Sequence, residues 1–257
     1  MSSFNRALTS TLGKKLIMSL TGLFLCTFLI VHLIGNLQLF KDDAGKAFND
    51  YAYFMTHFPP IKAVSYLLYA SIIIHAIYAL ILTIYNKKAR PVAYASYAGN
   101  KNSTWNSRNM GILGTVLLVF IATHMANFWW KFHNDQVPYI EYRTDLSTLE
   151  TQATEISAGD FIDYQKFTQD GEEITKARDL YKQVSYAFQN PLLVAFYVLA
   201  MAALSFHLIH GFRSAFQTLG FDHKKYVPII RFLAVWIFGI IIPIAFAAMP
   251  LYFFFCK

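Results

Sequence analysis

Five long apolar stretches dominate the sequence, and polar segments separate them. A transmembrane helix needs about 20 consecutive, mostly apolar residues, and each stretch is long enough. Prolines at or just before the start of the second, fourth and fifth stretches are typical of helix beginnings. The pattern predicts an all-α integral membrane protein, a single domain over 1–257, with a bundle of five transmembrane helices at approximately 16–40, 61–85, 109–131, 191–217 and 228–255.

Composition supports a lipid environment for these stretches. Of the 257 residues, 56% are hydrophobic, 17% are aromatic and only 14% are charged, whereas a soluble domain has about 25% charged residues. The formal net charge of +7 by itself suggests a nucleic-acid partner. The basic residues, however, form short clusters beside the apolar stretches, as membrane topology signals do. We therefore expect membrane lipid around the chain and no nucleic acid.

Loop charge predicts the orientation. The segments 1–15 and 86–108 contain basic residues and no acid, and 213–231 has four basic residues against one aspartate. The segment 134–190 instead carries eleven Asp or Glu residues. Because cytoplasmic loops are enriched in Lys and Arg, we expect the N-terminus and the 2–3 and 4–5 loops in the cytoplasm. The 1–2 loop, the 134–190 insertion and the C-terminus are then extracytoplasmic.

Three further features refine this organisation. The basic N-terminus resembles a signal peptide, but its apolar run continues without a small-residue cleavage site, which predicts a retained helix. Two short amphipathic helices are expected in the insertion, in "AGDFIDYQKF" and "YKQVSYAFQ". Cys26 and Cys256 belong to no CxxC or CxxCH motif, which argues against covalent c-type haem and thiolate metal sites.

Four histidines within the predicted spans fall at paired depths. Given the orientation, His32 on the first helix and His124 on the third lie in the outer half of the membrane. By the same argument, His75 on the second helix and His207 on the fourth lie in the inner half. At 1.5 Å per residue, the two levels differ by roughly 10–15 Å along the membrane normal.

This sorting predicts a di-haem bundle. A single intramembrane histidine is explained by a hydrogen bond to a neighbouring helix, but chance gives four no reason to sort in pairs. Two facing imidazoles on different helices are what a six-coordinate haem iron needs as axial ligands. Zinc is disfavoured because no Cys or carboxylate lies at ligand spacing within the spans. The absence of Asp and Glu from the spans argues against an ion-coupled transporter.

Four motifs in the same order resemble one family. They are "GLFLCTFLIVHLIGN" around His32, "IIIHAIY" around His75, "FIATHMANFWW" around His124 and "FHLIHGFRSAFQTLG" around His207. The sequence resembles, over all five helices, the di-haem cytochrome b (b558-type) membrane anchor subunit of succinate dehydrogenases and fumarate reductases. The resemblance implies two haem b groups, a distal one held by His32 and His124 and a proximal one held by His75 and His207.

The resemblance also bears on nearby residues. It implies a polar contact from Ser19 to a proximal haem propionate, and the spacings to Gly211 and Gly220 match the family pattern for His207, not for His210. We therefore expect His210 to contact a propionate or quinone. From their depth, Arg213 and Arg108 are candidate propionate partners, with snorkelling to lipid headgroups as the alternative.

The resemblance implies the partners as well. A flavoprotein (FAD) subunit and an iron–sulfur subunit dock on the cytoplasmic face of a bacterial cytoplasmic (inner) membrane. Electrons pass between succinate or fumarate and menaquinone, so the subunit serves the respiratory chain and the tricarboxylic acid cycle. The dicarboxylate site lies on another subunit, and no catalytic residue is assigned to this chain. Dimerisation of the whole complex stays open.

Two departures and two alternatives remain. The 134–190 insertion is longer than the family leads us to expect, and Ser205 stands where some relatives carry a glutamate of a proton route. The first alternative is a cytochrome b subunit of another membrane oxidoreductase, of the hydrogenase or formate dehydrogenase type. The second is a haem-free transporter or structural membrane protein.

Overall fold

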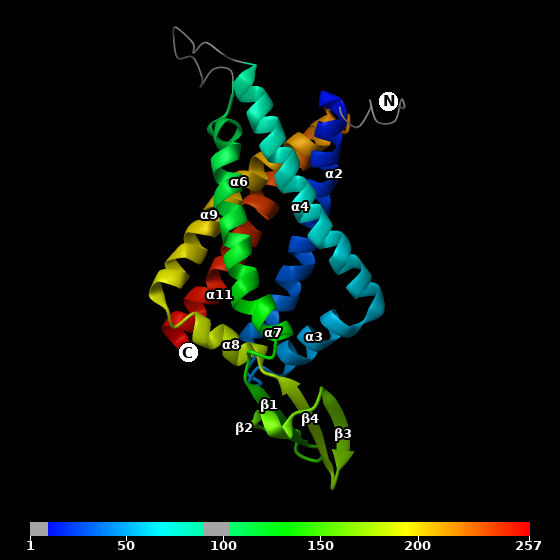
Figure 1. Cartoon of the computed structure of the whole chain (residues 1–257), viewed down its shortest axis with the longest axis vertical. Coiled ribbons are helices and arrows are strands. Elements are labelled where there is room, and N and C mark those ends of the chain that lie inside the picture. The colour runs from blue at the N-terminus through cyan, green and yellow to red at the C-terminus, as the bar shows by residue number, and fades with distance from the viewer. Residues whose placement is uncertain (1–9, 90–102) are drawn as a thin grey trace. The chain divides into compact units, whose positions relative to one another are not determined.

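The structure, a computed structural model, describes residues 10–89 and 103–257. These residues are mostly helical, and five of their helices are long and apolar enough to cross a membrane (Figure 1). This confirms the predicted fold class and makes the chain a multi-pass membrane protein. Three basic residues used in the orientation argument, Arg6, Arg90 and Lys101, lie outside the described residues.

The five spans match the predicted stretches, but their backbones are not uniform. The second and fourth are single helices, α4 (Pro59–Lys88) and α9 (Pro191–Thr218). The first is α2 (Thr11–Asn36) with a 3₁₀ turn, η1 (Leu37–Phe40). The third comprises α6 (Trp105–His124), a π-helix η2 (Met125–Trp130) and α7 (Lys131–His133). The fifth comprises α10 (Val227–Phe232), a π-helix η4 (Leu233–Ile241) and α11 (Ile242–Cys256).

The chain forms two compact units whose boundaries fall inside the long helices. One unit, here called the helical unit, consists of Met1–Val31, Ser65–Phe120 and Tyr197–Ala247. The other, the sheet unit, consists of His32–Val64, Ile121–Phe196 and Ala248–Lys257. Each unit contains one of the predicted histidine pairs. The sheet unit also holds α3 (Lys46–His57), α8 (Leu180–Ala187) and all the described strands.

Four antiparallel strands form one sheet within the 134–190 insertion. They are β1 (Tyr139–Asp145), β2 (Thr151–Ile156), β3 (Gln165–Gln169) and β4 (Glu172–Arg178), in the order β2-β1-β4-β3. Tyr142 on β1 pairs with Thr175 on β4, and the side chains of Ile140, Tyr142 and Ala177 form a buried cluster. Buried and half-buried positions alternate over the first four residues of β1, as expected for a strand with one face against a core.

The expectation of a helix in "AGDFIDYQKF" is wrong. Only Ala158–Asp160 forms a 3₁₀ turn, and β3 begins at Gln165. From Gln165 the backbone is extended because it pairs antiparallel with β4. Five residue pairs form, from Gln165 opposite Lys176 to Gln169 opposite Glu172. The expected helix in "YKQVSYAFQ" is present as α8, and the Asp179 side chain caps its N-terminus by accepting a hydrogen bond from the Lys182 N–H.

A buried polar cluster joins α3, the sheet and α8. The amide nitrogen of Asn49, a residue only 1% exposed, donates to the Tyr142 hydroxyl and to Asp179 Oδ1, both at 2.9 Å. The Asn49 oxygen accepts from the backbone N–H of Tyr181 at 3.0 Å. Gly45, with φ of 85°, precedes α3, and a Cβ there would collide with the Tyr181 ring. The sheet unit is thus assembled by contacts between distant parts of the chain.

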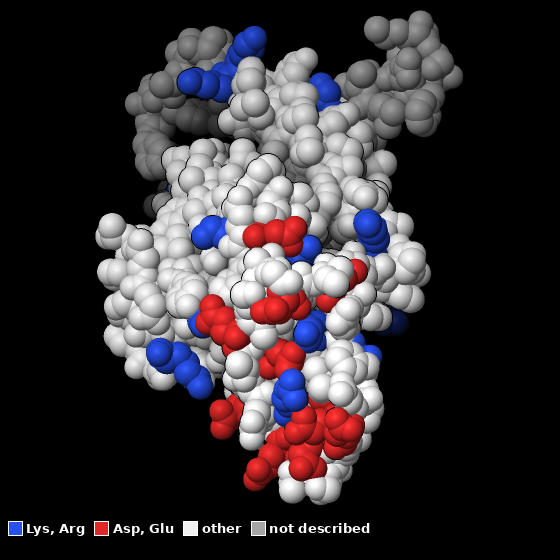
Figure 2. Space-filling model, turned by 60° about the horizontal axis from the view of Figure 1, so that its bottom comes forward, with Lys and Arg blue, Asp and Glu red and all other residues white. Residues whose placement is uncertain are grey.

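The surface of the sheet unit is strongly charged. Figure 2 shows acidic side chains gathered with fewer basic ones on the face toward the viewer. Several of these acids form ion pairs, such as Glu173 with both Lys46 and Lys166, and Glu141 with Lys176. A surface of this kind belongs in water, because unpaired charges are costly in hydrocarbon.

Within the helical unit, Pro243 removes one backbone hydrogen-bond donor from the fifth span. A proline has no N–H to donate to the carbonyl four residues earlier. For Pro243 that carbonyl belongs to Gly239, which lies in the π-helix η4. Ser205 on α9 donates its hydroxyl hydrogen to that carbonyl. A Cβ on Gly239 would collide with the Ile209 side chain, so the glycine permits the close approach on which this hydrogen bond depends.

Candidate functional site

In the sheet unit, the rings of His32 and His124 are neighbours. His32 lies on α2 and His124 is the last residue of α6, directly before the π-helix η2; their ring centres are 5.8 Å apart and nearly perpendicular, at 86°. The Asn36 amide nitrogen lies 3.4 Å from His32 Nδ1, and Phe128 packs edge-on against His124. Short π-helices often occur at functional sites, and this one follows directly after a histidine of the pair.

In the helical unit, His75 on α4 and His207 on α9 form the second pair. Their ring centres are 6.4 Å apart, with an angle of 60° between the planes. A Cβ on Gly22 of α2 would lie 3.3 Å from His75 Cε1, and one on Gly114 of α6 would lie 3.9 Å from His207 Cε1. Four helices therefore enclose this pair, and Gly22 allows α2 to approach the imidazole closely.

Each of the two pairs fits the binding of one haem iron between its two imidazoles. A metal–imidazole nitrogen bond is about 2.0 Å long, so two imidazoles on opposite sides of one metal have ring centres roughly 6 Å apart. The observed separations of 5.8 and 6.4 Å match this span. The Nδ1 atom of His207 is also buried without a hydrogen-bond partner, an unfavourable state that commonly marks a functional site. The residues present thus fit the group that the sequence suggests.

The other expected contacts are in varied surroundings. Ser19 is buried on α2, and its hydroxyl donates to the Lys15 carbonyl at 2.9 Å. Arg108 lies near the start of α6 and donates to the Ser103 carbonyl at 2.6 Å. Arg213 is exposed on α9 and lines a shallow groove with Phe216 and Phe221. These three residues stay candidates for an anionic group.

His210 does not share in the close ring pair. It lies on α9, partly buried and three residues after His207, and the ring that faces His75 is that of His207. The structure therefore places beside His75 the one fourth-helix histidine, His207, that the glycine spacing singled out. What His210 contacts when partners are bound stays a prediction.

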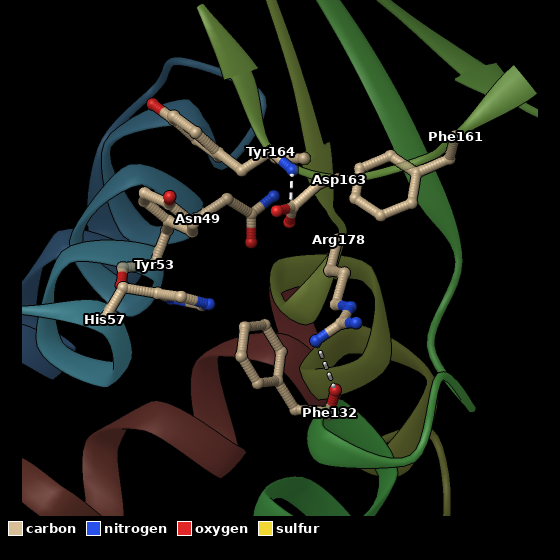
Figure 3. Close-up of a pocket in the computed structure, with 9 residues that line it drawn as sticks. Asn49, Tyr53, His57, Phe132, Phe161, Asp163, Tyr164 and Arg178 are labelled. Atoms are coloured by element: carbon tan, nitrogen blue, oxygen red, sulfur yellow. Dashed lines mark hydrogen bonds between the residues drawn. The ribbon is translucent and has the colours of Figure 1, made fainter. Parts of the chain in front are cut away.

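A shallow cleft, open to solvent, lies in the sheet unit and is lined by residues of α3, α7, β4 and the segment before β3. Tyr53 stacks between His57 and Tyr164, with ring centres 4.1 and 3.8 Å away. The Tyr164 hydroxyl donates to Asp50 at 3.1 Å, and burial, together with the Asp50 charge, raises the pKa of that phenol. Figure 3 shows the His57 imidazole and the Asp163 carboxylate directed toward the same space.

Residues of this cleft come from segments far apart in the sequence. The Tyr164 hydroxyl bonds to Asp50, 114 positions away, and Arg178, which also lines the cleft, pairs with Asp135 at 2.6 Å and donates to the Phe132 carbonyl at 3.3 Å. Only tertiary pairing brings them together, so no local motif could have identified them. Thr21, whose hydroxyl lies 3.1 Å from His75 Nδ1, was missed for the same reason.

The described parts of the chain, 10–89 and 103–257, contain no cluster of three or more His, Cys, Asp or Glu side chains suited to a metal ion. The chain matches no protein-family model, no curated protein and no solved structure.

Proposed function

We propose that the chain is the membrane-anchoring, quinone-reactive di-haem cytochrome b subunit of a succinate:menaquinone oxidoreductase (succinate dehydrogenase or fumarate reductase). One observation carries the proposal. Four membrane-spanning helices each contribute one histidine, and the rings meet in two separate pairs with centres 5.8 and 6.4 Å apart. A bundle that only spans a membrane needs no such arrangement, whereas two bis-imidazole haem sites require it.

The chain's residues would have distinct tasks. His32 and His124 would hold the distal haem b, and His75 and His207 the proximal one. Bound haem supplies a one-electron carrier, whereas the protein provides ligands, orientation and an apolar, water-poor surrounding that tune it. Ser19, Arg108 and Arg213 are the proposed partners of propionates or of a quinone, since a cation or hydroxyl stabilises an anion best where water is scarce.

The partners follow from the same proposal. The flavoprotein and iron–sulfur subunits would dock at the cytoplasmic face, where the basic loops favour the positive-inside orientation. Oxidation of succinate to fumarate releases two electrons and two protons, and menaquinone takes up two of each to become menaquinol. The sheet unit's strands would lie outside the cytoplasmic membrane, in keeping with their charged surface.

A reduced-minus-oxidised spectrum of the purified chain tests the proposal. We expect a b-type α-band and a stoichiometry of two haems per chain. A chain purified from haem-replete cells without such a band would leave the transporter or structural alternative. Co-purification of the soluble subunits separates the remaining rival. Succinate-dependent reduction of a menaquinone analogue supports the proposal, and hydrogen- or formate-dependent reduction contradicts it.

A further inference from the structure

Thr21 on α2 lies beside the Nδ1 edge of the His75 imidazole, within the helical unit. Its Oγ1 is 2.7 Å from the carbonyl oxygen of Ile17 and 3.1 Å from His75 Nδ1. The next residue is Gly22, where a Cβ would lie 3.3 Å from His75 Cε1 and 3.8 Å from Nδ1. Thr21 and Gly22 thus both lie next to the same edge of the His75 ring.

The hydrogen bonds of Thr21 determine which His75 nitrogen carries the hydrogen. A threonine hydroxyl has one hydrogen to donate and lone pairs to accept. The short bond to Ile17, four residues earlier, is the usual use of that hydrogen in a helix. The hydroxyl oxygen must then accept from His75, so Nδ1 carries the hydrogen. A neutral imidazole has only one N–H, which leaves the lone pair on Nε2.

We propose that Thr21 is a positioning residue that fixes His75 in its Nδ1–H tautomer and orients the ring so that Nε2 can bind the haem iron. This inference rests on the proposed function. The opposite arrangement, with the hydroxyl donating to Nδ1, would put the hydrogen on Nε2 and prevent metal binding there. A hydrogen bond to the far nitrogen of a metal-bound histidine also raises the basicity of the ligand.

The partner imidazole has no equivalent support among the described residues. His207 Nδ1 is buried without a hydrogen bond. Within this pair, Thr21 therefore fixes the tautomer of His75 only. Replacement of one hydroxyl should therefore affect one haem and leave the other unchanged.

The first experiment compares three variants of the full chain, purified with its partner subunits. Thr21→Val removes the hydroxyl at nearly constant shape, and Thr21→Ser retains it. Thr27→Val is the matched control, because Thr27 lies on the same helix and its hydroxyl likewise bonds to a carbonyl four residues earlier, that of Leu23 at 3.1 Å. The measurements are the midpoint potential of each haem and the rate of haem transfer to apomyoglobin.

We expect Thr21→Val to raise the potential of one haem and to speed its loss by roughly tenfold, in line with other replacements of groups that support a metal ligand. Thr21→Ser and Thr27→Val should behave as the unsubstituted chain does. The inference is overturned if Thr21→Val matches Thr27→Val while both haems are present. It is equally overturned if Thr21→Ser loses the haem as readily as Thr21→Val, because the hydroxyl would then not be the deciding group.

The second experiment does not depend on haem. Nitrogen NMR of the haem-free, ¹⁵N-histidine-labelled chain, with His75 assigned from a His75→Gln variant, reports which ring nitrogen is protonated. We expect hydrogen on Nδ1, and a loss of this preference in Thr21→Val. Hydrogen on Nε2 in the unsubstituted chain would overturn the tautomer assignment. A chain that binds no haem yet carries the hydrogen on Nδ1 would instead refute the proposed function and leave the tautomer assignment standing.

Discussion

The two histidine pairs reach nearly the same separation in very different surroundings. The His75 and His207 pair lies in a unit whose described regular elements are all helices, where glycines allow close approach and a threonine hydroxyl holds one ring. The His32 and His124 pair lies in a unit that also contains a sheet and a buried polar cluster. Helical packing therefore suffices to bring two imidazoles together, and the sheet unit's additional contacts must serve another purpose.

The buried polar cluster around Asn49 indicates that these additional contacts hold the insertion in place. Asn49 joins residues 93 and 130 positions away along the chain, and so attaches the insertion to α3. In the helical unit, by contrast, side-chain hydrogen bonds connect pairs of helices at single points, such as the one from Ser205 on α9 to the Gly239 carbonyl. Substitutions in one unit should consequently leave the histidine pair of the other unaffected.

Removal of a ligand is the largest expected effect. On the proposed function, His207→Ala should remove one haem and His32→Ala the other, because each variant lacks one of the two histidines that would hold that haem. His210→Ala should retain both haems. Haem stoichiometry and redox titration of the purified variants provide the measurement. Loss of a haem in His210→Ala with retention of both in His207→Ala would reverse the assignment.

Asn49→Leu tests the independence of the sheet unit. It deletes three buried hydrogen bonds and leaves Asp179, Tyr142 and the Tyr181 N–H short of partners. We expect the insertion to lose about 3 kcal/mol of stability, since each buried polar group left unpaired costs about 1–3 kcal/mol. Hydrogen exchange over 134–190 should rise, with little change in the exposed control Asn134→Leu. A simultaneous loss of the haem assigned to His75 would show that the units are not independent.

Ser205→Ala tests the support that the helical unit gives to the fifth span. The Gly239 carbonyl would lose its donor from α9, which we expect to lower the free energy of unfolding by about 1 kcal/mol. Pro243→Ala supplies a new backbone N–H nearby, so the serine substitution should matter less in the double variant. Unfolding of the four proteins in mixed micelles gives the coupling. Strict additivity would show that the hydroxyl does not compensate for the proline.

Asp179→Asn concerns pH dependence, the smallest of these effects. Burial raises the pKa of the Asp179 carboxyl, only partly opposed by the hydrogen bond from Asn49. A raised native pKa means that this group's contribution to stability is full below its unfolded value of 3.8 and is lost as pH rises through the native value. Asparagine retains the Oδ1 that accepts from Asn49 and Lys182.

The measurement is the proteolytic susceptibility of the insertion from mildly acidic to neutral pH. The unsubstituted chain should become more susceptible as pH rises through the native Asp179 pKa, and Asp179→Asn should lack that component. An equal pH response in both proteins would exclude Asp179 as its source.

The sequence by itself determined the five spans, because a run of about 20 apolar residues has few stable arrangements outside lipid. It also predicted which imidazoles meet, since helix direction and loop charge assign each histidine a depth. It predicted none of the four strands, and β2 and β3, whose side chains are almost all exposed, carry no burial alternation to detect. Those strands form through backbone pairing with β1 and β4.

Only the tertiary structure decided the finer chemistry. The contact of Thr21 with His75 spans 54 positions, and that of Tyr164 with Asp50 spans 114. Each depends on a side-chain separation of about 3 Å, set by how particular helices and strands pack. Apolar periodicity fixes which face of an element is buried but leaves open which polar atom meets which across the interface. The sequence thus determined the bundle and its histidines, and packing decided how their rings are held.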